Sequence, residues 1–121
     1  MAKNFVAAGN VVDYTNAGAL ITSGSVVKLS HTVGIALADI ATGETGSVAV
    51  EGVFDVPKVS AAVFAVGEKL LWDASAGAFD DAAATPASGD VMGAVIAMKA
   101  GLNTETTARV KLTPGNATLT A

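Results

Sequence analysis

Residues 47–56 read Ser47-Val-Ala-Val-Glu-Gly-Val-Phe-Asp-Val56, and this stretch decides the fold class. Its valines recur at nearly every second position, which is the period of a β-strand with one buried face. Gly52 predicts a break in the middle of the stretch. Pro57 ends it, because proline has no N–H to donate to a neighbouring strand. The stretch therefore predicts two short consecutive strands.

Short segments of the same kind occur on both sides of this stretch. β-branched residues dominate them, and glycine-rich turns bound them. They cover residues 11–15, 26–29, 33–37, 69–72, 91–98 and 108–112. Residues 41–46 and 73–77 have the composition of hairpin connections, whereas the alanine-rich residues 59–66 predict either a short helix or a buried strand. We expect an all-β fold, a small single-domain β-barrel or sandwich of short antiparallel strands.

The two halves of the chain resemble each other weakly. The aligned pairs are residues 24–29 with 67–72, Val33-Gly34 with Met92-Gly93, and Val48 and Val50 with Ala108 and Val110. Two such units would have to pack together, since neither buries its apolar face alone. Chance is the alternative explanation, because short strands with glycine turns match one another easily.

A chain of 121 residues is long enough for one domain and too short for two. We expect residues 1–10 to form an N-terminal arm and residues 11–112 to form the β-domain. Residues 113–121 are polar and predict a loosely held tail. Residues 74–88 read as a loop whose role the sequence leaves open.

Composition excludes several classes of function. The net charge is −4 and the seven Lys and Arg are scattered singly along the chain, so we expect no binding to nucleic acid. No apolar stretch approaches the roughly 20 residues of a membrane-spanning helix, so we expect no membrane partner. The chain is nevertheless 51% hydrophobic and only 15% charged. That balance predicts that other subunits cover part of its surface, and we expect self-association as a homotrimer.

No catalytic or metal-binding motif is apparent. The single histidine, His31, lies between Ser30 and Thr32 in a predicted turn, and no nucleophile-elbow motif accompanies it. The alternating oxygens of Asp73 and Ser75 resemble part of a calcium loop, but the bidentate glutamate is missing and the composition is that of an ordinary turn. We therefore expect no enzyme activity, no catalytic residue, no metal and no cofactor.

Several longer segments of the sequence resemble those of a known family. They are Met1-Ala-Lys-Asn-Phe-Val6, Gly9-Asn-Val-Val-Asp-Tyr-Thr15, Glu51-Gly-Val-Phe54 and Gly67-Glu-Lys-Leu-Leu-Trp-Asp73. From Ala2 to about Leu112 the chain is similar to the capsid cement (head decoration) proteins of tailed bacteriophages and prophages. The loop of residues 74–88 is longer than the corresponding loop of the family that the chain resembles.

The resemblance implies a structural virion protein that binds the outer surface of a phage capsid and stabilises it. Its partners would be the major capsid protein and further copies of itself. It would be made in the host cytoplasm and would lie on the capsid exterior of the virion. The alternative is a non-enzymatic β-module that binds carbohydrate or a receptor on a phage tail or a bacterial surface. That alternative needs exposed aromatic side chains, of which the chain has few.

The arm contains the candidate capsid-contacting residues, Phe5, Val6 and Asn10. Phe5 and Val6 are apolar but have no alternating partners that would place them on a strand with a buried face. An arm of this kind could add as a strand to the edge of a capsid protein. The alternative is that Phe5 plugs the end of its own barrel.

Overall fold

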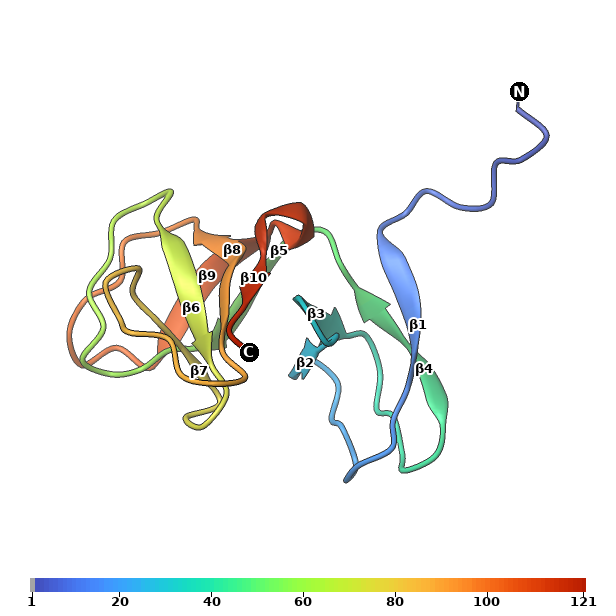
Figure 1. The fold of residues 1–121 in the computed structure, drawn as a ribbon, viewed down its shortest axis with the longest axis horizontal. Helices are drawn as coiled ribbons and strands as arrows, with labels where there is room; N and C mark the ends of the chain where they lie inside the picture. The colour runs from blue at the N-terminus through green and yellow to red at the C-terminus, as the bar shows by residue number, and fades with distance from the viewer. Residues whose placement is uncertain (1) are drawn as a thin grey trace.

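The computed structural model describes residues 2–121, and within them the chain forms ten strands and one short 3-10 helix (Figure 1). The strands are β1 (Val11–Thr15), β2 (Val26–Lys28), β3 (Val33–Ala36), β4 (Thr45–Ala49), β5 (Val53–Pro57), β6 (Lys69–Asp73), β7 (Ala78–Asp80), β8 (Val91–Ala97), β9 (Thr107–Leu112) and β10 (Thr118–Leu119). The helix η1 covers Pro114–Asn116. All strand pairs are antiparallel. The predicted all-β class is confirmed.

The strands form two sheets that lie side by side (Figure 1). The first has the order β1-β4-β3-β2, and the second has the order β5-β9-β8-β6-β7, with β10 beside β8. One apolar core joins them, since Ile35 and Ala49 of the first sheet belong to the same buried cluster as Val95 and Val110 of the second. The arrangement is sandwich-like and not a closed barrel.

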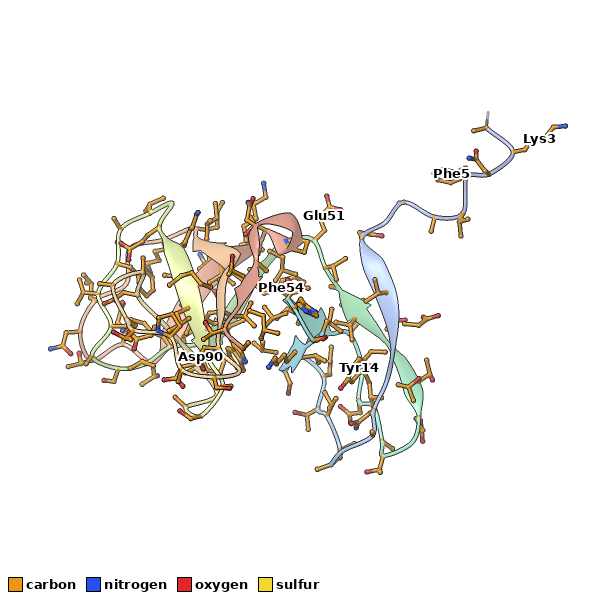
Figure 2. The ribbon with its side chains drawn as sticks, viewed as in Figure 1. Lys3, Phe5, Tyr14, Glu51, Phe54 and Asp90 are labelled. Atoms are coloured by element: carbon orange, nitrogen blue, oxygen red, sulfur yellow. The ribbon has the colours of Figure 1, made fainter. Side chains whose placement is uncertain are left out.

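A second, smaller cluster occupies the opposite face of the first sheet. Val27, Ala36, Ile40 and Val48 form it, and the half-buried ring of Tyr14 packs against it from β1 (Figure 2). The first sheet is therefore buried on both faces over its central strands, although β1 is itself largely exposed.

The two sheets are built on one plan. The order β1-β4-β3-β2 is repeated as β5-β9-β8-β6, and an isolated antiparallel bridge follows the same scheme in each half, Ile21 with Ile40 and Phe64 with Gly101. We call residues 11–49 the N-unit and residues 53–112 the C-unit. The weak repeat in the sequence thus corresponds to a repeated fold.

The register of the repeat differs from the alignment of the sequence by two residues in its later part. Lys28 lies beside Val33 and Leu71 lies beside Met92, so Val33 and Met92 are equivalent, as in the alignment. Beyond them, Ala49 lies beside Ile35 and Lys111 lies beside Ile96, so these later pairs are equivalent with the shift. The reason is an irregularity in β8: between two successive pairs, the pairing advances by two positions along β6, from Lys69 to Leu71, but by four along β8, from Ile96 to Met92. Gly93 lies within it at a φ of 82°, a conformation that favours glycine.

Residues 59–66 form neither a helix nor a regular strand. They make turns and a single bridge at Phe64, whose N–H donates to the carbonyl of Gly101 over 3.1 Å. The Phe64 ring is buried against Gly101, where a Cβ atom would collide with it. A close backbone approach at a glycine thus replaces both of the expected alternatives.

The loop before β8 is held by hydrogen bonds to a buried carboxylate. Asp90 is 4% exposed; its Oδ1 accepts from the Ala74 N–H over 3.0 Å, and its Oδ2 accepts from the Ala87 N–H over 2.9 Å (Figure 2). The backbone of Asp90 also accepts from Thr120, whose segment includes β10. Residues 74–90 and the C-terminal segment are therefore hydrogen-bonded to each other. The loose attachment of residues 113–121 in solution remains a prediction.

Candidate binding surfaces

The N-terminal arm extends away from both sheets (Figure 1). Phe5 is 64% exposed and Val6 is 93% exposed, and Figure 2 places Lys3 and Phe5 well beyond the end of β1. The backbone N–H of Phe5 donates to the carbonyl of Ala2 within the arm itself, over 3.3 Å. In this arrangement Phe5 does not plug the end of its own sheet.

Asn10 lies at the root of the arm and not on its exposed part. Its carbonyl accepts a hydrogen bond from the Val50 N–H over 3.0 Å, one residue beyond the pairing of β1 with β4. The three candidate residues are thus divided: Asn10 fixes the point at which the arm leaves the body, and Phe5 and Val6 lie beyond that point.

β1 continues the arm and forms one edge of the first sheet. It pairs with β4 over five residue pairs, from Val11–Ala49 to Thr15–Thr45, and among the described residues no strand pairs with its other edge. Val11 and Val12 are both more than one third exposed. An unpaired edge of this kind offers backbone N–H and C=O groups to a strand from another chain.

The cations that look scattered in the sequence gather on the outward face of the second sheet. Lys69, Arg109 and Lys111 lie there, and Lys99 follows β8 at the same end. Arg109 Nε donates to Asp55 Oδ1 over 3.0 Å in an exposed ion pair, and this bond lowers the pKa of Asp55. The sequence did not predict this surface, although the exposed positions Thr107, Arg109 and Lys111 of β9 alternate with buried ones.

Two shallow hollows open on the surface. One, of about 420 Å³, is polar and lies beside the Arg109–Asp55 pair, with Lys99 and Glu105 on its wall. The other, of about 490 Å³, lies between the two units, where Val26 faces Pro57 and Trp72. The side-chain hydrogen bonds of Asp55 and Glu105 in the polar hollow go to Arg109 and to the Leu102 N–H, and not to a threonine hydroxyl.

The residues that the sequence singled out for chemistry take part in turns. The Ser30 hydroxyl and His31 Nδ1 are 3.0 Å apart in an exposed turn. Asp73 Oδ1 accepts hydrogen bonds from the Ser75 hydroxyl and from the backbone N–H groups of Ser75 and Ala76. These bonds lower the pKa of Asp73, the Ser75 hydroxyl most strongly. Over residues 2–121, no cluster of three His, Cys, Asp or Glu side chains is placed to hold a metal ion.

The comparisons with known proteins bear on the whole fold. A sequence model of the family described as phage cement protein matches residues 6–112, which span both units and begin within the arm. A search of curated proteins finds none that matches the chain. Among the described residues, no helix has the length and apolar character needed to span a membrane.

Proposed function

The chain belongs to the phage cement protein family, and from this premise we propose that it binds the outer surface of an assembled phage head and stabilises the shell. Family membership makes it a structural protein of the phage capsid. In our proposal it is made in the host cytoplasm, attaches to the major capsid protein on the capsid exterior, and acts without catalysis or a cofactor.

The exposed arm is the observation that supports this proposal. Phe5 and Val6 are exposed, and the backbone hydrogen bond of Phe5 is to Ala2 within the arm and not to a sheet. Burying one such side chain contributes about 1.5–3 kcal/mol, and a strand added along an edge contributes backbone hydrogen bonds. Each copy can bind weakly, because many copies on one shell act together. We propose that residues 1–10 make the contact and that residues 11–112 form the rigid body that carries them.

We also propose that the protein acts as a homotrimer. Large apolar side chains are exposed on both units as well as on the arm. The most exposed of those on the units are Leu20, Val53, Val63, Val66 and Leu102. A surface with this many apolar side chains and few charges is typical of one that other subunits cover.

The alternative function, recognition of carbohydrate or a receptor, would use an exposed aromatic platform. Trp72, Phe64 and Phe79 are buried. Among the described residues, one aromatic side chain is more than half exposed. It is Phe5, which lies on the arm. The described surface therefore favours attachment through the arm.

Deleting residues 2–9 tests the proposal. We expect the truncated protein to melt at the temperature of the full chain, because these residues contact no core cluster, but to be lost from heads in a co-sedimentation assay. The double substitution Phe5→Ser with Val6→Ser should reproduce the loss. Ala82→Ser with Ala83→Ser, at two exposed alanines of the loop before β8, is the control and should leave binding intact.

Two results would overturn the proposed role of the arm. One is full occupancy of heads by the truncated protein. The other is unfolding of the truncated protein, which would make the segment part of the domain.

A further inference from the structure

A row of side chains crosses four adjacent strands on the outward face of the C-unit. Lys69 of β6 lies beside Ile96 of β8, Ile96 lies beside Lys111 of β9, and Lys111 lies beside Val53 of β5. Residues paired in this way have their side chains on the same face of a sheet. Lys69, Lys111 and Val53 are exposed and Ile96 is half-buried.

A second row continues this surface. Arg109 of β9 lies beside Asp55 of β5, and the N–H of Met98 donates to the carbonyl of Arg109 over 2.8 Å. Met98 is 42% exposed, and Lys99 follows it. We call these two rows the outer face of the C-unit. It combines four cations with exposed apolar side chains.

The remainder of the chain has the opposite charge. The sequence contains seven Lys and Arg and eleven Asp and Glu. Setting aside the four cations of the outer face and Asp55 leaves three cations and ten acids elsewhere. The outer face is therefore complementary in charge to the rest of the same protein.

In the N-unit, the face equivalent to the outer face of the C-unit is covered. Its residues Val26, Ile35 and Ala49 occupy the places of Lys69, Ile96 and Lys111. Val26, Ile35 and Ala49 pack into the core between the two units. The same face of the fold is thus an interface in the N-unit. In the C-unit it is uncovered, with cations where the N-unit has Val26 and Ala49.

We propose that the outer face of the C-unit docks the acidic N-unit of a second copy of this chain. The N-unit and the link to β5 expose Asp13, Asp39, Glu44 and Glu51. Lys28 is their only Lys or Arg, and its Nζ donates to the Gly89 carbonyl over 2.9 Å. Contact between two different surfaces is heterologous, and a rotation that closes it gives a ring such as a trimer. This inference rests on the proposed self-association and not on the proposed capsid contact.

Sedimentation velocity of the full chain tests the inference. We expect association at about 0.05 M salt that weakens at about 0.5 M salt, because screening reduces the attraction between exposed charges. Lys111→Gln should weaken association by about tenfold or more. Thr85→Glu changes the net charge by the same amount on an exposed loop residue and is the matched control, expected to associate like the parent.

A charge-swapped pair identifies the partner surface. Lys69→Glu with Lys111→Glu, and separately Asp13→Lys with Glu44→Lys, should each abolish association of a single preparation. Mixing the two preparations should restore association, because the reversed face then meets a reversed N-unit and the unchanged face meets an unchanged N-unit. A ring of three would still contain one mismatched contact, so association is scored by the loss of monomer and not by the return of a trimer. Circular dichroism checks that both preparations are folded.

Several results would overturn the inference. A parent protein that is monomeric at about 100 μM in low salt would do so, as would unchanged association of Lys111→Gln. Failure of the mixed preparations to associate would exclude the N-unit as the partner. If Lys111→Gln still associates but no longer binds heads, the outer face contacts the shell. Head binding is measured separately, so a protein that associates but does not bind heads contradicts only the proposed function.

Discussion

Asn16 and Lys58 occupy equivalent places in the two units and perform the same task with different chemistry. Asn16 directly follows β1, and Lys58 directly follows β5; both are at most 4% exposed. Asn16 Nδ2 donates to the carbonyl of Ile40 over 2.9 Å, and Lys58 Nζ donates to the carbonyl of Glu105 over 3.2 Å. Each side chain therefore ties the end of the first strand of its unit to the loop before the last strand.

Replacing Lys58 by Met should destabilise the protein. Lys58 Nζ also donates to the carbonyls of Val59 and Ser60, over 2.9 and 3.1 Å, so the change leaves three carbonyls without this partner. We expect the free energy of unfolding to fall by about 2–4 kcal/mol, measured by urea denaturation. Lys3→Met, at an exposed lysine of the arm, is the control and should change it little. A Lys58→Met protein as stable as the parent would mean that desolvation of the ammonium outweighs its hydrogen bonds.

Gly93→Ala should be strongly destabilising. Gly93 has a φ of 82°, and a Cβ atom there would lie 2.6 Å from the Asn116 carbonyl oxygen. We expect a loss of about 2–4 kcal/mol in the free energy of unfolding, because strain in the backbone adds to the clash with η1. Gly115→Ala is the matched control, since a Cβ atom at Gly115 meets nothing within 4 Å. Equal melting temperatures for the two variants would refute this account of the irregularity in β8.

The turn at Asp73 should contribute stability that depends on pH. Hydrogen bonds from Ser75 and Ala76 lower the pKa of Asp73 in the folded protein, whereas the unfolded value is about 3.9. The contribution is therefore complete above the unfolded value and disappears as the pH falls through the folded value. Asp73→Asn should lower the melting temperature slightly at pH 7, and the difference from the parent should shrink as the pH falls below the unfolded value. A difference that is constant with pH would show that the carboxylate charge plays no part.

Local pattern was enough to predict most of the strands. Alternation and glycine placed β1, β6 and the pair β4 and β5, including the break at Gly52, whose φ is 120°. β7 was missed because its three residues have no alternation of their own; it depends on pairing with β6 and on the Phe79 ring, whose centroid lies 5.0 Å from that of Trp72.

The candidate surfaces depended on information that a local pattern does not contain. The exposed position of Phe5 and Val6 is the part of the arm hypothesis that sequence could suggest, because no alternating partners surround them. Lys69 and Lys111 are 42 residues apart in the sequence and meet on one face only through Ile96 of β8. Lys58 looks like any other isolated cation until its buried carbonyl partners are placed. Strand register, and not composition, decides these cases.

The way in which the arm enters β1 determines how the protein carries mechanical load. The arm leads directly into β1, and the hydrogen bonds between β1 and β4 run across the strands. A force that pulls the arm along the axis of β1 is therefore shared by all five residue pairs at once, together with the Asn10–Val50 bond. A force at right angles to that axis would peel the pairs apart one after another. The attachment thus resists tension along the strand far better than it resists lifting away from the sheet.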